Sequence, residues 1–243
     1  MASMNLSCRG SVLAVCVLGA TSGLAQIQPV NGSLSGKVMG EDSTAIIGAT
    51  VAIHLTSPTT SRLRPQQTDW SAQTLTSGAF DVSGLSEGTY TLCPRMPNST
   101  WLSPCEWNFP TPVATITRSS PNPTLTITLK RGAAVPVRID DAGRLLAQHE
   151  GKTPGAGLLL SVSGPGLFFR LVPLVSQDSA GRNYQIVIPF STQLTLAIHP
   201  SFYGVSNASG AALPQAASTK IPLLVAVGQQ VSPIRFKITG AGH

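Results

Sequence analysis

Histidine is the side chain best suited to proton transfer near neutral pH, so a catalytic site is first sought around the four histidines. They lie far apart in the sequence, at positions 54, 149, 199 and 243, and none is followed by glutamate three residues later. The H-x-x-E zinc pattern is therefore absent. A serine nucleophile would also need a histidine base and an acid that orients this base. With its histidines so dispersed, the chain is not expected to be an enzyme, and no catalytic residue is assigned.

Paired carboxylates could hold a metal ion or act as acid and base, and Asp140 and Asp141 are adjacent in the sequence. A calcium ion binds about 6–8 oxygen ligands, whereas the nearest further acid along the chain is Glu150. Aspartate is also a frequent turn residue, and Gly143 follows closely. We therefore interpret the pair as part of a turn and expect neither a metal site nor a cofactor.

Aromatic side chains cluster around Cys105, where Trp101, Trp107 and Phe109 lie in a loop that prolines stiffen. Exposed tryptophans on a fixed loop can stack on sugar rings or contact a protein partner. The same side chains could instead cap a β-sandwich and pack on a disulfide at Cys105. Both interpretations stay open, so these three residues are candidate ligand contacts.

Two of the four cysteines, Cys93 and Cys105, lie outside the N-terminal segment and are twelve residues apart. No histidine lies near them, so their spacing does not indicate a metal site. In an oxidising compartment such an isolated pair forms a disulfide, which is what we expect here. Closing a loop of this length stabilises a fold by about 3 kcal/mol in the loop-entropy description.

The first 25 residues have the features of a signal peptide. Arg9 precedes an apolar run over residues 11–20, and small residues at Gly23 and Ala25 fit cleavage before Gln26. The run is shorter than the ~20 residues that span a bilayer, and no second run reaches that length. Export to the periplasm, the cell surface or the medium is expected, with no transmembrane segment in the mature chain. Lipidation at Cys16 stays open, because the residues before it weakly match a bacterial lipobox.

Composition and charge exclude several classes of protein. Hydrophobic residues make up 42% of the 243 residues and charged residues 11%, which is incompatible with intrinsic disorder. The formal net charge is +6, but the basic residues are scattered, and the densest groups are Arg62/Arg64 and Lys130/Arg131. Because nucleic acids are bound by a clustered basic face, they are not expected as partners.

Short β-strands are predicted along the whole mature chain, because Thr, Val and Ile alternate with polar residues between Gly- and Pro-rich turns. Residues 124–129 show the clearest period of two, and no capped amphipathic helix is found. The predicted strands are residues 33–39, 50–56, 70–75, 80–82, 89–93, 113–117, 124–130, 135–140, 157–163, 168–175, 184–189, 194–199 and 234–239, with a further candidate at 223–227.

These strands divide into two β-rich halves of similar layout, each long enough to bury one small core. Residues 26–131 and 132–243 are therefore expected to form two domains that meet within the stretch 130–135. The predicted fold class is all-β, with two immunoglobulin/transthyretin-like β-sandwich domains after a signal peptide.

Residues 76–92 carry the most distinctive pattern of the chain, G-x-F followed by G-L-x-x-G-x-Y-x-L. Together with Gly36-Lys-Val38 and Gly48-Ala-Thr-Val51, this pattern resembles carboxypeptidase regulatory-like domains, over about residues 33–131. The resemblance implies a transthyretin-like sandwich without catalytic activity, because the zinc site of such enzymes belongs to a neighbouring domain. Related domains occur in exported bacterial surface proteins.

The same residues also have a purely structural explanation. Gly78 and Gly84 suit turns that require positive φ, while Phe80 faces the core. The hydroxyl of Tyr90 is expected to donate a hydrogen bond to a backbone carbonyl near the start of its strand, as sandwich tyrosines often do.

These observations together predict an exported, non-catalytic structural or binding protein of the cell envelope or extracellular space. Its expected partner is a cell-envelope protein or a polysaccharide. The alternative is a carbohydrate-binding module that uses the aromatic loop near Cys105.

Overall fold

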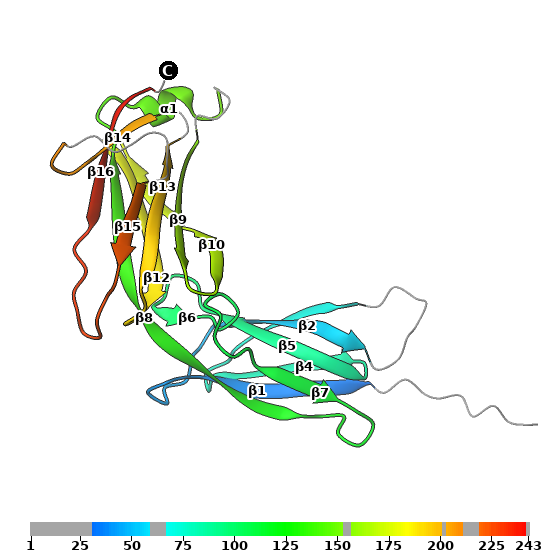
Figure 1. Ribbon diagram of the computed structural model, residues 1–243. Coiled ribbons are helices and arrows are strands. Elements are labelled where there is room, and N and C mark those ends of the chain that lie inside the picture. The colour runs from blue at the N-terminus through cyan, green and yellow to red at the C-terminus, as the bar shows by residue number, and fades with distance from the viewer. Residues whose placement is uncertain (1–30, 59–66, 153–156, 201–202, 211–218, 242–243) are drawn as a thin grey trace, which may run out of the picture.

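The fold is almost entirely β-structure (Figure 1). The computed structural model describes residues 31–58, 67–152, 157–200, 203–210 and 219–241, so the predicted signal peptide, Cys16 and the Arg62/Arg64 pair lie outside the described residues. Within these ranges the all-β prediction is confirmed, because the one helix is the short α1 (Leu145–His149). No helix in the described part of the chain is long and apolar enough to cross a bilayer.

Two sheets pack against each other in the first half of the chain. One has the strand order β4–β1–β8 and the other β3–β2–β5–β7. Apolar residues at alternate positions of both sheets form a common core, in which Leu34, Ile53 and Tyr90 are fully buried. The strands are β1 (Gly32–Gly40), β2 (Thr50–Pro58), β3 (Asp69–Gln73), β4 (Ala79–Leu85), β5 (Gly88–Arg95), β6 (Trp101–Leu102), β7 (Val113–Ile116) and β8 (Thr124–Asp140).

A second pair of sheets encloses a separate core in the second half. One sheet has the order β11–β12–β8–β16–β14, and the sheet that faces it has the order β10–β9–β13–β15. Val162, Ile198 and Phe236 are among the residues buried between them. The strands are β9 (Leu158–Gly164), β10 (Leu167–Leu171), β11 (Leu174–Asp178), β12 (Gly181–Pro189), β13 (Leu194–Pro200), β14 (Tyr203–Asn207), β15 (Thr219–Leu223) and β16 (Ile234–Ala241).

Strand β8 belongs to both halves, and Figure 1 shows it running through the angle at which the two halves meet. The sequence pattern predicts two separate strands at 124–130 and 135–140, and this prediction is wrong. The period of two continues without a phase change, so odd-numbered residues face the first core as far as Leu129 and the second core from Ala133 onward. The alternation of inward apolar residues is interrupted only at position 131, where an exposed arginine lies between the two cores.

The backbone at this junction is hydrogen-bonded rather than free. Strand β6 pairs with β8 at Lys130 and Arg131, and the N–H of Gly132 donates to the carbonyl of Thr100 at 2.8 Å. A Cβ at Gly132 would lie 2.5 Å from the carbonyl oxygen of Ile188, so only glycine allows the neighbouring strand to approach this closely. The junction is therefore an ordered part of the sheet.

The turn predicted at Asp141 is confirmed, but it also begins a helix that the sequence pattern does not predict. The Asp141 carboxylate accepts the backbone N–H groups of Leu145 at 2.8 Å and Leu146 at 2.9 Å, at the start of α1. Five residues are too few for a recognisable apolar periodicity, which is why the sequence does not indicate this helix. So short a helix is not stable by itself and depends on the two hydrogen bonds to Asp141 and on the burial of Leu146.

Two other local predictions differ from the structure. The single strand expected at 168–175 is two strands, β10 and β11, which separate at Pro173 because proline lacks the N–H that a ladder needs. The candidate strand at 223–227 is wrong, since β15 ends at Leu223.

The hydrogen bond predicted for Tyr90 is confirmed. Its hydroxyl donates to the carbonyl of Ser86 at 2.8 Å, just before β5 begins. Gly78 and Gly84 also have positive φ, as expected for their turns.

Tyr90→Phe is expected to lower the free energy of unfolding by about 1 kcal/mol, because a partly buried hydrogen bond is lost while the ring still fills its site. Chemical denaturation of both proteins measures this difference. An unchanged free energy would show that the bond makes no net contribution to stability.

Candidate functional site

The long loop between β5 and β7, residues 96–112, lies at the junction of the two halves. The disulfide predicted between Cys93 and Cys105 is confirmed, with 5.6 Å between the two Cα atoms. Cys93 belongs to β5, so the bond ties the middle of the loop to the first half of the chain. The backbone of Leu92 adds a second tie, because its N–H donates to the carbonyl of Pro112 at 2.9 Å.

The aromatic side chains of this loop pack against both cores. Trp107 is only 6% exposed and is part of the second core, although the disulfide holds its loop on the first half. Phe109 packs against the same core, whereas Trp101 packs against the first core. A loop of the first half therefore supplies apolar surface to the second.

Each of the three rings also has a cation over its face. Arg131 lies 4.3 Å from the ring centre of Trp101, Lys130 lies 5.0 Å from that of Phe109, and Arg170 lies 5.0 Å from that of Trp107. Cation–π contacts of this kind each contribute about 0.5–2 kcal/mol.

The three predicted ligand contacts thus lie at the junction but pack against different cores, and each ring has a cation of the protein over one face. Trp107 is buried, which favours packing over ligand contact for this residue. Contact of the three residues with a ligand stays a prediction.

Glu106 connects the two halves by ion pairs. Its carboxylate contacts Arg95 of β5, and its other oxygen lies 2.9 Å from a guanidinium nitrogen of Arg170 in β10. Arg170 is the residue whose guanidinium covers Trp107. We call Arg95, Glu106, Trp107 and Arg170 the junction cluster, because these four residues join a strand of each half through the disulfide-held loop.

Arg131 of β8 is also held by two residues of the turn that follows β1. Its guanidinium donates to Asp42 at 3.0 Å, and its backbone N–H donates to Glu41 at 3.0 Å. The pKa of Asp42 is lowered to about 2, first by the hydrogen bond from Thr44 and then by Arg131. The turn after β1 therefore also holds the junction.

Two histidines have polar partners that sequence reasoning did not find. The Ser161 hydroxyl lies 2.8 Å from Nε2 of His199, on neighbouring strands. Ser161 is buried, and within the described ranges no carboxylate bonds the other ring nitrogen of His199, so the pair lacks the acid that orients a catalytic base. Ser161 and His199 both lie on the outer face of their sheet, because each alternates with inward-facing apolar residues of its strand. This alternation is visible in the sequence and could have indicated the contact.

His54 contacts Asp69 on the exposed face of the first half, and Thr68 donates to the same carboxylate at 2.7 Å. These hydrogen bonds, that of Thr68 first, lower the pKa of Asp69. In a catalytic triad the histidine stands between the nucleophile and the acid, whereas here the acid stands in the middle. Among the described residues, no three His, Cys, Asp or Glu side chains gather as metal ligands.

The serine-hydrolase pattern G-x-S-x-G does occur at residues 84–88, where sequence reasoning overlooked it. In the structure these residues form the turn from β4 to β5, two strands of different sheets. A nucleophile elbow lies between a strand and a helix instead. The backbone carbonyl of the central residue, Ser86, receives the structural hydrogen bond from Tyr90.

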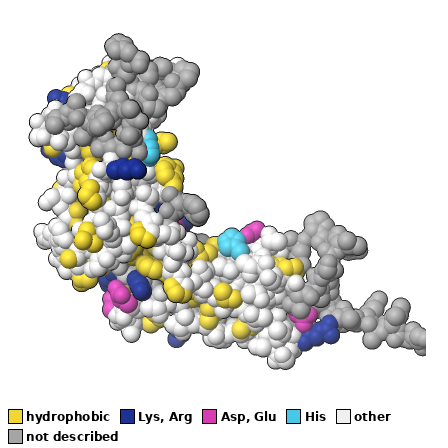
Figure 2. Space-filling model, in the orientation of Figure 1, with side chains coloured by type: hydrophobic (Ala, Val, Ile, Leu, Met, Phe, Trp, Pro, Cys, Tyr) yellow, Lys and Arg dark blue, Asp and Glu magenta, His cyan; other side chains and the backbone are white. Residues whose placement is uncertain are grey.

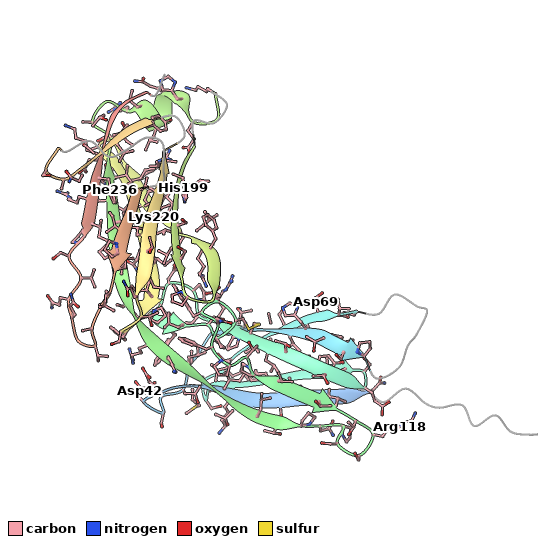
Figure 3. The ribbon with its side chains drawn as sticks, in the orientation of Figure 1. Asp42, Asp69, Arg118, His199, Lys220 and Phe236 are labelled. Atoms are coloured by element: carbon pink, nitrogen blue, oxygen red, sulfur yellow. A yellow bond between two sulfur atoms is a disulfide. The ribbon has the colours of Figure 1, made fainter. Side chains whose placement is uncertain are left out.

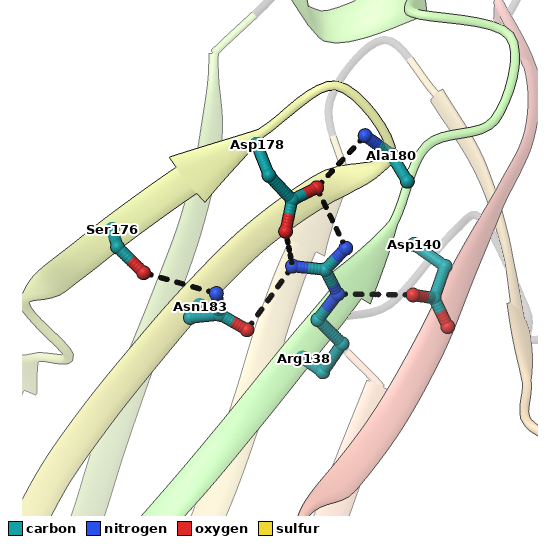
Figure 4. Close-up of polar contacts among 6 residues, drawn as sticks. All are labelled: Arg138, Asp140, Ser176, Asp178, Ala180 and Asn183. Atoms are coloured by element: carbon teal, nitrogen blue, oxygen red, sulfur yellow. Dashed lines mark hydrogen bonds and ion pairs between the residues drawn. The ribbon is translucent and has the colours of Figure 1, made fainter.

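A network of polar side chains surrounds Arg138 on the outer face of the second half (Figure 4). Its guanidinium donates to both carboxylate oxygens of Asp178, at 2.7 and 2.9 Å, to Asp140 at 3.0 Å and to Asn183 at 3.1 Å. All of its partners come from strands of the same sheet, so this network joins β8, β11 and β12. These contacts lower the pKa of Asp178 to about 2, chiefly through the hydrogen bonds from Arg138.

Asp178→Asn is expected to reduce the acid sensitivity of the fold. A carboxylate with a lowered pKa stabilises the folded state above its ordinary pKa of 3.8, and this contribution is lost as the pH falls toward about 2. The unmodified chain should therefore lose stability across this window more steeply than the variant. Thermal unfolding at a series of pH values measures both slopes, and Asp81→Asn, at an exposed position of β4, serves as the control. Equal slopes for all three proteins would contradict the prediction.

No protein-family model matches this chain, and no curated protein matches its sequence. Solved structures with a related arrangement of strands include a streptococcal ancillary pilin, at 10% identity and a TM-score of 0.41 over 86% of this chain. The minor pilin of Streptococcus agalactiae matches at 11% identity and a TM-score of 0.37, over 86% of this chain and 96% of the pilin. Chlorocatechol 1,2-dioxygenase from Pseudomonas putida matches at 10% identity and a TM-score of 0.31, over 42% of this chain.

This chain spans 63% of the ancillary pilin and 61% of the dioxygenase. At such low TM-scores the similarities establish neither a family nor a function. The resemblance to carboxypeptidase regulatory-like domains stays a prediction.

Proposed function

We propose that this chain is an exported, non-catalytic structural protein of the cell envelope or extracellular space, in which two β-sandwich domains form a stiff, bent spacer. The domains correspond to residues 26–131 and 132–243, with the change from one to the other inside β8. The observation that carries the proposal is the junction itself, where one continuous strand and one disulfide-held loop belong to both halves.

Stiffness follows from the number of independent contacts at the junction. Beside the hydrogen-bonded backbone of β8, Trp107 is buried in the second core and Glu106 pairs with a cation on each half. Domains joined by a plain linker and a small polar interface move relative to each other by default. Here the buried indole and the covalent loop oppose such movement.

The disulfide also supports the proposed location. Disulfides persist in oxidising compartments and are rare in the cytosol, so Cys93–Cys105 agrees with the predicted signal peptide. Figure 2 shows acidic and basic side chains as isolated spots on the visible face and not as a patch of one sign. Such a surface suits an exposed scaffold, and the proposed partner is a cell-envelope protein or a polysaccharide.

Expression of the full chain in a bacterial host, followed by fractionation, tests the location. The protein should leave the cytoplasm with a new N-terminus at Gln26, whereas an unprocessed cytoplasmic product would refute export. Small-angle X-ray scattering of the exported protein tests the shape. One bent conformation is expected, and a broad distribution of shapes would refute the stiff spacer. Co-sedimentation with envelope proteins and with insoluble glycans then identifies the class of partner.

A further inference from the structure

The outer face of the sheet β10–β9–β13–β15 is unusually apolar. Leu159, Phe169 and Leu171 are 52%, 51% and 54% exposed there. The strand register places them together: Leu171 pairs with Ser161, and Leu159 pairs with His199. The Phe169 ring lies 5.9 Å from the ring of His199. We call Leu159, Phe169, Leu171, His199 and Lys220 the apolar face.

The charge on this face has one sign. Its four strands contain no carboxylate, and Lys220 continues the row that begins at Leu171, through Ser161 and Ala197. Lys220 makes no ion pair within the part of the chain that the structure describes. Figure 3 shows Lys220 and His199 on neighbouring strands of the second half.

The other sheet of the second half is different. Its outer face carries Arg138 paired with Asp178 and Asp140, and nearby Arg182 is paired with Glu150. Carboxylates lie among the basic side chains of that face, whereas the four strands of the apolar face contain none. Arg235 and Lys237 are exposed on that sheet too, so the apolar face differs by having no carboxylate beside its exposed hydrocarbon, and not by having a cation.

We propose that the apolar face binds the surface of a lipid bilayer that carries anionic headgroups. Half-exposed leucine and phenylalanine side chains lose contact with water when they enter the acyl boundary, and Lys220 is attracted by the headgroups. The inference rests on the proposed function insofar as an envelope protein meets such a membrane.

Two other occupants fit the face less well. A second copy on a two-fold axis would bury Lys220 and His199 of both copies in an interface whose strands contain no carboxylate to pair with them. A glycan needs hydrogen-bonding side chains, whereas the hydroxyl of Ser161 is buried and already bonded to His199.

Flotation of the exported protein with vesicles tests the proposal, using phosphatidylcholine alone and an equimolar mixture with phosphatidylglycerol. Binding is expected to the mixture and not to phosphatidylcholine alone. The double change Phe169→Ser/Leu171→Ser should weaken it roughly tenfold, because two insertable side chains are lost. Lys220→Glu should weaken it at least about fivefold.

The matched controls carry comparable changes on the other sheet. They are Leu174→Ser/Val175→Ser on β11 and Lys237→Glu on β16, all exposed positions, and they should bind like the unmodified chain. Circular dichroism and thermal midpoints verify that every variant is folded.

Several outcomes would overturn the proposal. They are absence of binding to the mixed vesicles, equal losses in the control variants, a dimer that Phe169→Ser/Leu171→Ser dissociates, and retention on an acidic polysaccharide that depends on the same residues. A chain that is exported and stiff but ignores the vesicles would refute the membrane proposal alone. A chain retained in the cytoplasm would refute the proposed function while leaving vesicle binding a separate result.

Discussion

Trp107→Ala is expected to lower the free energy of unfolding by about 3–5 kcal/mol, the usual cost of truncating a buried indole. The side chain is buried in the second core, although its loop is held on the first half by the disulfide. The truncation leaves a cavity at the junction and removes the ring under Arg170. The loss of stability should therefore be accompanied by weaker coupling between the two halves.

Chemical denaturation measures the loss, and small-angle scattering of the folded variant measures the coupling. Trp101→Ala is the matched control. It removes another indole of the same loop, and this indole is only partly buried and packs on the first core. The control should lose clearly less stability than Trp107→Ala. A change below about 0.5 kcal/mol for Trp107→Ala is typical of an exposed residue and would favour a ligand-contacting tryptophan instead.

Replacing both Cys93 and Cys105 with serine is expected to cost about 3 kcal/mol, the loop-closure contribution for a ring of this size. The change also releases Glu106 and Trp107, which follow Cys105 directly, from their covalent anchor on β5. The junction cluster then depends on ion pairs and packing alone. We expect a broader distribution of shapes in scattering as well as a lower midpoint in denaturation.

Glu106→Gln provides the control that separates the covalent from the ionic contribution. It weakens the pairs with Arg95 and Arg170 but leaves the disulfide intact, so its effect on stability should be smaller than that of the double serine variant. Equal stability of the double serine variant and the unmodified chain would contradict the anchoring role of the disulfide. Alkylation without reduction should label neither cysteine in the unmodified protein.

Local regularities in the sequence were sufficient to predict most of the strands. The period of two at 124–129 and the turn glycines Gly78 and Gly84 indicate them directly, because alternation and positive φ are properties of a few neighbouring residues. The Tyr90 hydrogen bond and the Cys93–Cys105 disulfide were also predictable, since both join residues close in the sequence. The all-β class follows from the same local signals.

The structure of the junction could not be predicted from local sequence patterns. The exposed Arg131 interrupts the apolar pattern, so the sequence suggests two strands where β8 is continuous, and only the two cores on either side explain the interruption. The burial of Trp107 is not evident from its loop, because the strands that cover it come from the other half. The five-residue helix α1 and the two-residue strand β6 are too short to have any periodicity.

The apolar face shows the same division. Alternation in the sequence places Leu159 and Leu171 on one side of their strands but does not say which side is covered. That depends on which sheet packs on which, a choice made by the summed burial of residues far apart in the chain. The sequence by itself therefore determined the strands, their turns and the covalent loop, whereas the tertiary structure alone decided how the halves join and which hydrophobic side chains stay exposed.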